Sequence, residues 1–172
     1  MEFQMHKIKQ EFDSFYIEDI EGEVKQEIDN LNLKIKKGQR IAITAGSRGI
    51  DRIPFILKAV AGKVKDLGGE PFLVPAMGSH GGATAEGQKK ILEELGITSE
   101  FVGVPVISSM EIVKVGAFCV AANGNNKSVE IPVVIDKNAY EADGIIIVNR
   151  VKPHTSFHSD IESGMMKMIA IG

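Results

Sequence analysis

Strand-like and helix-like segments alternate from residue 40 onward, and this order most constrains the fold. An apolar strand is predicted over 40–44, after Gly38, and is followed by a loop over 45–50. Asp51 is the expected N-cap of the next helix, in which apolar side chains recur at helical spacing up to Leu67 before Gly68 and Gly69. The segment therefore predicts one strand, loop and helix unit.

A second unit follows, with a strand over Glu70–Pro75, a loop over 76–83 and a helix over 85–95 capped by Thr84. The order indicates an α/β fold with a mainly parallel sheet and helices on both faces. Strand-like runs over 111–121 and 128–135 flank an Asn-Gly turn signal and predict an inserted antiparallel hairpin.

Two further strands are expected on pattern alone. Residues 14–20 alternate apolar and polar side chains, as in a half-buried strand. Residues 144–148 are almost continuously apolar, as in a strand covered on both faces. Cys119 is the only cysteine, and we expect it to be a buried strand thiol in a reducing compartment.

Composition favours a single domain over 1–172 and excludes several partners. Twenty basic and 23 acidic residues are interspersed, so no patch for a nucleic-acid backbone is expected. No leader-like or membrane-spanning apolar run is present in the sequence, which predicts a cytoplasmic protein without a membrane partner. The chain ends in an apolar run over 169–172, so we expect it to be a fragment of a longer protein.

Three loops follow predicted strands and should meet at the carboxyl edge of the sheet, where open α/β folds bind ligands. They span 45–50, 76–83 and 149–167, and they contain Arg48, His80 and His154. The arginine fork suits a carboxylate or phosphate, and each imidazole suits acid/base chemistry near neutral pH. Gly78, Gly81 and Gly82 allow the backbone to approach an anion closely.

Lys167 lies between methionines, and such surroundings would lower its pKa and make the amine nucleophilic. A helix-surface lysine or an ion pair with Glu162 are the alternatives. His158 is a surface histidine, a metal ligand or a rival acid/base to His154.

Three motifs resemble the nickel-dependent lactate racemase family, most closely an uncharacterised subgroup. They are Asn-Arg-Val-Lys-Pro-His-Thr over 149–155, Glu-Ser-Gly-Met-Met-Lys-Met over 162–168 and Ala-Met-Gly-Ser-His-Gly-Gly-Ala-Thr over 76–84. The resemblance implies an α/β N-terminal domain that is followed by a second domain, with the active site between them.

The resemblance implies a racemase or epimerase of a 2-hydroxy acid, an isomerase that uses a nickel pincer nucleotide. Lys167 would attach this cofactor, His80 and His154 would be the acid/base pair, and Arg48 would hold the substrate carboxylate. The backbone of Gly78, Ser79, Gly81 and Gly82 would hold the cofactor phosphate. No nickel ligand is assigned in this chain, because the family's nickel-binding histidine would lie beyond Gly172.

The sequence departs from lactate racemase in ways that leave the substrate open. The loop with Arg48 lacks the Asp and Pro of that enzyme, and Gly81-Gly82 stand where it has Arg-Pro. Another 2-hydroxy acid or a sugar acid is as good a candidate as lactate. Two other functions remain: a non-catalytic module that binds a nucleotide or carboxylate, and a zinc hydrolase built from His80, His154 and His158.

Overall fold

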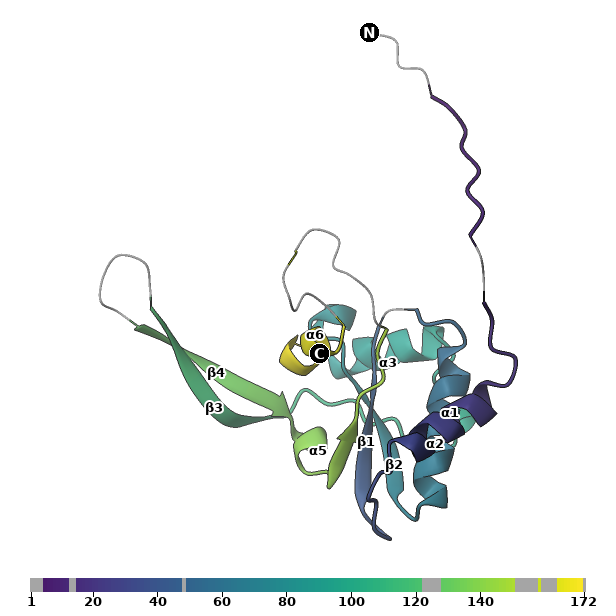
Figure 1. The fold of residues 1–172 in the computed structure, drawn as a ribbon. Helices are drawn as coiled ribbons and strands as arrows, with labels where there is room; N and C mark the ends of the chain where they lie inside the picture. The colour runs from purple at the N-terminus through teal and green to yellow at the C-terminus, as the bar shows by residue number, and fades with distance from the viewer. Residues whose placement is uncertain are drawn as a thin grey trace.

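The computed structural model describes residues 5–12, 15–47, 49–121, 128–150, 158 and 164–171. Three strands form a parallel sheet in the order β2-β1-β5, with bounds Glu70–Pro75, Arg40–Ala45 and Gly144–Ile146. A separate antiparallel hairpin pairs β3 (Ile112–Ala121) with β4 (Ser128–Asp136). Figure 1 shows this hairpin projecting away from the sheet. The prediction of an α/β fold with an inserted hairpin is confirmed.

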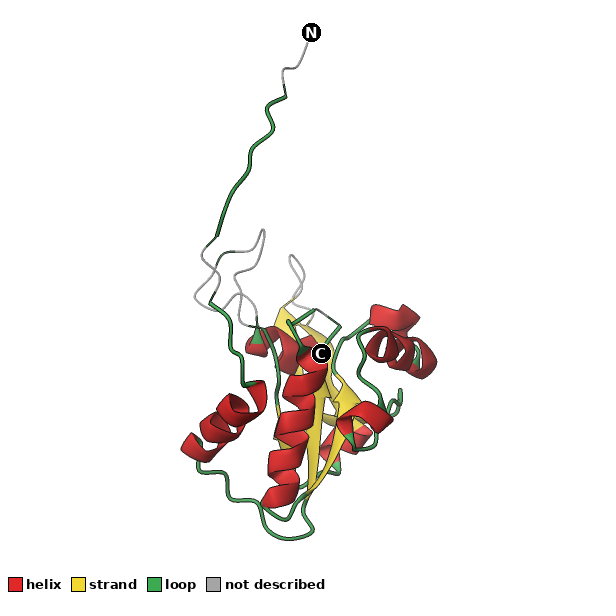
Figure 2. Cartoon of the chain, turned by 90° about the vertical axis from the view of Figure 1, so that its right-hand side faces the viewer, coloured by secondary structure: helices red, strands yellow, loops and turns green. Residues whose placement is uncertain are grey.

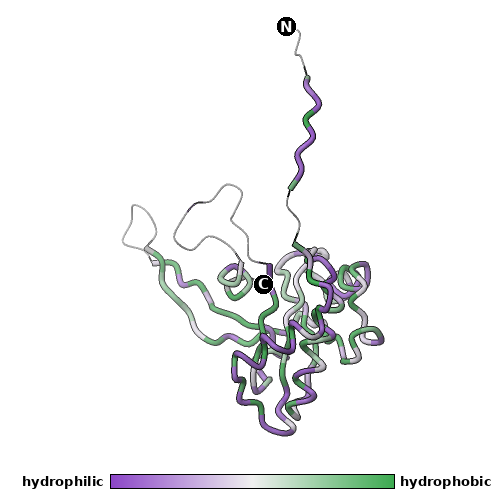
Figure 3. Tube along the Cα trace, turned by 45° about the vertical axis from the view of Figure 1, so that its right-hand side comes forward, coloured by the Kyte–Doolittle hydropathy of each residue, from purple (hydrophilic) through white to green (hydrophobic). Residues whose placement is uncertain are grey.

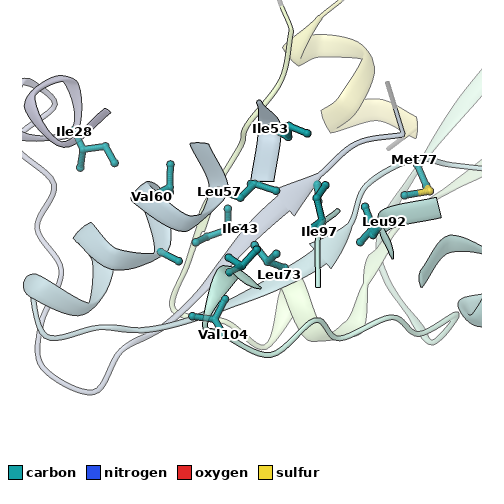
Figure 4. Packing of buried hydrophobic residues seen from close by; sticks show 13 residues of the cluster. Ile28, Ile43, Ile53, Leu57, Val60, Leu73, Met77, Leu92, Ile97 and Val104 are labelled. Carbon is teal, nitrogen blue, oxygen red and sulfur yellow. The ribbon is translucent and has the colours of Figure 1, made fainter. Parts of the chain in front are cut away.

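Helices cover one face of the sheet extensively. This layer contains α1 (Ile20–Asn30), α2 (Ile53–Asp66), α3 (Ala85–Glu94) and α4 (Ser99–Val102), visible beside the yellow strands in Figure 2. Its core packs Ile43 and Leu73 of the sheet against Leu57 and Leu92, all four fully buried (Figure 4). Burial of such side chains stabilises the fold by roughly 1.5–3 kcal/mol each.

The opposite face has a smaller cover. Ala42, Phe72 and Val74 point to that side, because neighbouring residues of a strand alternate between faces. They pack against Ala139 of the short helix α5 (Lys137–Tyr140) and against the base of the hairpin. Helix α6 (Met165–Ile171) also reaches this side through Met168, whose sulfur accepts a hydrogen bond from the Thr44 hydroxyl.

The predicted strand over 14–20 is wrong. The described residues 15–19 form no strand, and α1 begins at Ile20, where the Asp19 carboxylate accepts a hydrogen bond of 2.8 Å from the Gly22 amide. An N-cap followed by acidic residues in the first turn is a helix-start signal, and it overrides the short apolar alternation before it.

Asp51 is also not the cap of α2. Arg52 occupies that position in a left-handed conformation, with φ of 52°, and its side chain makes no capping hydrogen bond. Pro54 stands in the first turn, where its missing N–H removes one of the donors that a cap would satisfy. The Arg52 carbonyl accepts the amides of Phe55 and Ile56 instead.

Two burial predictions are wrong. Strand β5 lies at an edge of the described sheet, and its Ile145 is 43% exposed rather than covered on both faces. Cys119 is exposed, because its hairpin has only two strands and the described residues place no second layer over it. Figure 3 shows the apolar colouring that runs along both hairpin strands.

Candidate functional site

The first two predicted loops meet at the carboxyl edge of the sheet. Parallel pairing of β1 and β2 ends at Ala45 and Pro75, so the chain leaves both strands at the same level. The Ala76 amide continues this pairing with a hydrogen bond of 2.9 Å to the Ala45 carbonyl. Beyond it, the hydroxyl oxygen of Ser47 lies 2.6 Å from Nδ1 of His80.

His80 is exposed at the start of the 3-10 turn η1 (His80–Ala83), and its amide donates to the Met77 carbonyl at 3.2 Å. Since Ser47 engages Nδ1, Nε2 is the ring nitrogen that remains suited to a ligand. A histidine can accept a proton at Nε2 only when the hydrogen of the neutral ring is on Nδ1. When the serine oxygen accepts a hydrogen bond from Nδ1–H, Nε2 is the basic nitrogen, whereas a hydroxyl that donates to Nδ1 corresponds to the tautomer with the hydrogen on Nε2.

The glycines near His80 are required by the backbone. Gly78, Gly81 and Gly82 have φ of 59°, 66° and 67°, a region that side chains disfavour. A Cβ on Gly81 would lie 2.4 Å from the carbonyl carbon of Gly87 in α3, whereas a Cβ on Gly82 would meet no described residue within 4 Å. Gly81 therefore lets the loop pack on α3, while the described residues leave the backbone of Gly82 open.

Gln88 of α3 supports the same loop and was not singled out by sequence. Its side-chain amide donates a hydrogen bond of 2.8 Å to the Gly78 carbonyl, and the residue is 6% exposed. The available signal was a polar residue on the inward face of an amphipathic helix. Ser79 is exposed, and its carbonyl accepts the Ala83 amide.

Lys167 lies exposed on α6, so the predicted apolar enclosure of its amine is wrong for the described residues. Consecutive residues of a helix point about 100° apart, and the neighbouring methionines therefore face different directions. Met166 is half-exposed, and Met168 packs inward against Thr44. Thr44 also accepts the Val148 amide at 3.1 Å, which joins the start of the third loop to the sheet.

Some predicted site residues lie outside the described part of the chain. These are Arg48, His154 and Glu162. The carboxylate-binding arginine, the second acid/base and the acidic partner of Lys167 therefore remain predictions. His158 is described and exposed.

A cavity of about 300 Å³ lies beside the predicted site, between the ends of β1 and β2, the base of the hairpin and α6. Gly78 is the predicted site residue that lines it; His80 and Lys167 do not. Met77, which precedes Gly78, and Met168, which follows Lys167, also line it. The cavity therefore adjoins the elements that carry the two candidate functional groups.

Electrostatic shifts near this cavity come from one ion pair. The Glu111 carboxylate accepts a hydrogen bond of 3.1 Å from Lys137, and this bond and the charge of Glu111 raise the pKa of Lys137 above its usual 10.5. The pair ties the entrance of the hairpin to α5. Among the described residues, no group of three or more His, Cys, Asp and Glu side chains has the arrangement of a metal site.

Comparisons with protein-family models, with curated proteins and with solved structures yield no match for this chain. Within the described residues, none of the helices combines the length and the apolar character that crossing a membrane requires.

Proposed function

We propose that this chain is the N-terminal domain of a racemase or epimerase of 2-hydroxy acids that uses a lysine-tethered nickel pincer nucleotide. The observation that carries the proposal is the Ser47–His80 hydrogen bond, since it joins two loops at the ligand-binding edge of the sheet and orients a histidine for proton transfer. The motifs around His80, His154 and Lys167 supply the reaction class. A second domain would supply the nickel-binding histidine.

The described residues fit attachment of such a group. Lys167 presents its amine to solvent, so a cofactor can reach it without unfolding the domain. The packing of Met168 on Thr44 holds α6 against β1, the strand that leads to Ser47. The described residues leave the backbone of Gly82 open, as a phosphate contact requires.

In the proposed reaction, a cofactor held by Lys167 would supply the hydride chemistry at C2 of the substrate, and the residues of this chain would bind the substrate and move its hydroxyl proton. His80 would accept the hydroxyl proton at Nε2 when the substrate presents one configuration, in the tautomer whose Nδ1–H donates to the Ser47 oxygen. His154 would serve the opposite configuration, and Arg48 would hold the substrate carboxylate through two hydrogen bonds. Inversion would follow when the hydride returns to the opposite face of C2 while the other histidine gives a proton back to the carbonyl oxygen.

The test is racemisation by the complete protein, loaded with cofactor and supplied with one enantiomer of each candidate 2-hydroxy acid. Chiral chromatography measures the product. Replacement His80→Ala should reduce the rate about 10²–10⁴-fold, the usual contribution of a positioned acid/base. His6→Ala, which alters an exposed histidine of the N-terminal segment, is the matched control and should leave the rate unchanged. Unchanged racemisation by the His80 variant would refute the assigned role.

A binding module without catalysis is the second candidate, because the exposed Lys167 lies outside the cavity lining and need not take part in holding a nucleotide or carboxylate. In that case Lys167→Ala would leave the affinity for a nucleotide or carboxylate nearly unchanged. A covalently attached cofactor would be lost completely from the same variant.

A further inference from the structure

The cavity between the sheet, the hairpin and α6 has three neutral polar side chains in its described wall, and each has a hydrogen-bond partner within the protein. Thr44 donates to the Met168 sulfur, and Gln88 donates to the Gly78 carbonyl. The Ser109 hydroxyl oxygen accepts the amide of Glu111 at 3.0 Å. Because these side chains already have hydrogen-bond partners, a polar ligand would gain little by binding to them.

The two carboxylates of the wall are engaged in the same way. Asp136 accepts the Ala139 amide at 2.9 Å as the N-cap of α5, and Glu111 is paired with Lys137. Among the described lining residues there is no lysine or arginine. The described lining therefore offers an acid group no cationic partner, and most of its surface is apolar.

Its size and plasticity suit a small substituent. A volume of about 300 Å³ lies at the lower end of the roughly 300–1,000 Å³ of small-molecule sites. Met77, Met110 and Met168 line the wall, and methionine adapts its shape to an irregular apolar group. A methyl group would leave most of this space empty.

We infer that the cavity binds a bulky apolar substituent at C2 of the substrate, so that the preferred substrate is a 2-hydroxy acid with an aliphatic or aromatic side chain rather than lactate. The inference rests on the proposed function for its reaction class. It adds a specificity site, with the acid and hydroxyl groups lying outside the cavity toward the loop of His80. Met77 belongs both to the cavity wall and to that loop, so a substrate in the cavity would adjoin the loop that carries His80.

The first test measures binding without catalysis. The chain carries ¹³C on its methionine methyl groups and is titrated with phenyllactate or with lactate, without cofactor. Phenyllactate should shift the signals of Met77, Met110 and Met168 and leave that of Met5, which is 94% exposed, in place. Its affinity should exceed that of lactate at least tenfold, because its ring removes far more apolar surface from water.

Neighbouring valines of β4 provide a matched pair of variants. Val134 lines the cavity and Val133 does not, although they are 46% and 42% exposed and point to opposite faces of the strand. Val134→Phe should weaken phenyllactate binding at least tenfold, whereas Val133→Phe should have no effect. Should Val134→Phe unfold the protein, the methionine titration of the unaltered chain decides alone.

Absence of selective methionine shifts, equal binding of lactate and phenyllactate, or equal effects of the two valine variants would each overturn the inference. None of these results would exclude racemisation, which is measured separately on the loaded protein. Loss of racemisation with selective phenyllactate binding would instead refute the proposed function and leave the apolar site in place.

Discussion

The Ser47 hydroxyl oxygen lies 2.6 Å from Nδ1 of His80, although 33 positions separate the two residues in the chain. The contact depends on the parallel pairing of β1 and β2, which brings the two strand ends to one edge. It gives Nδ1 of His80 a fixed partner, so Nε2 is the ring nitrogen that can contact a ligand.

Replacement of Ser47 by alanine should release the ring of His80. We expect ¹⁵N NMR to show a change in the populations of the two neutral tautomers, and the racemisation rate of the loaded complete protein to fall about tenfold, a fraction of the contribution of a positioned acid/base. Ser47→Thr retains the hydroxyl and should restore both. Identical His80 spectra in the alanine variant and the parent would show that the hydrogen bond does not control the ring.

Alanine at Gly81 should be much more harmful than alanine at Gly82. Both positions have positive φ, which costs about 1–2 kcal/mol for a side chain. Only Gly81 adds a clash, with its Cβ 2.4 Å from Gly87 and 2.5 Å from the Gln88 amide nitrogen. Denaturant unfolding should therefore show a loss of about 1 kcal/mol for Gly82→Ala and more than 2 kcal/mol for Gly81→Ala. Equal losses would contradict the packing of this loop on α3.

Thr44→Val removes a hydroxyl that serves two segments. The Val148 amide loses its acceptor and Met168 loses its donor, so the free energy of unfolding should fall by about 1–3 kcal/mol. Thr44→Ser keeps the hydroxyl and should cost less. The comparison is made by urea unfolding, and a valine variant as stable as the serine variant would argue against this role of the hydroxyl.

Lys137 should titrate above pH 10.5 in the folded protein, because Glu111 bonds to it and favours its charged form. A raised pKa means that the pair's contribution to stability is complete below pH 10.5 and disappears as the pH rises through the native value. In Glu111→Gln, NMR of the lysine side chain should show the pKa returning toward 10.5. Lys25, whose pKa is raised by Glu21, is the internal control and should not change.

The sheet, α2, α3 and the hairpin were predictable because each has a clear apolar period and a turn or capping signal, although the cap expected for α2, Asp51, was wrong. Strand β2 has the expected bounds, and Thr84 caps α3 by accepting the Gly87 amide. Helix α1 was missed because the local alternation before it competed with the Asp19 cap.

The site was less predictable, because its contacts depend on tertiary structure. A loop serine such as Ser47 carries no local signal, and its role follows only from the position of His80. Lys167 is exposed because its position on the helix faces solvent, whereas the methionines next to it in sequence suggested that its amine is enclosed. The apolar runs around Ile145 and Cys119 predicted that both residues are buried, but the described layers leave them exposed.

The most direct test of the proposed function is the intact mass and nickel content of the complete protein, produced in cells that also make the pincer cofactor. The account predicts a covalent adduct with bound nickel that is lost completely in Lys167→Ala and kept in Lys89→Ala, which alters an exposed lysine of α3. An unmodified parent protein, in cells that load a known racemase, would contradict it and favour the binding module. An adduct that persists in Lys167→Ala would contradict the assignment of the attachment lysine.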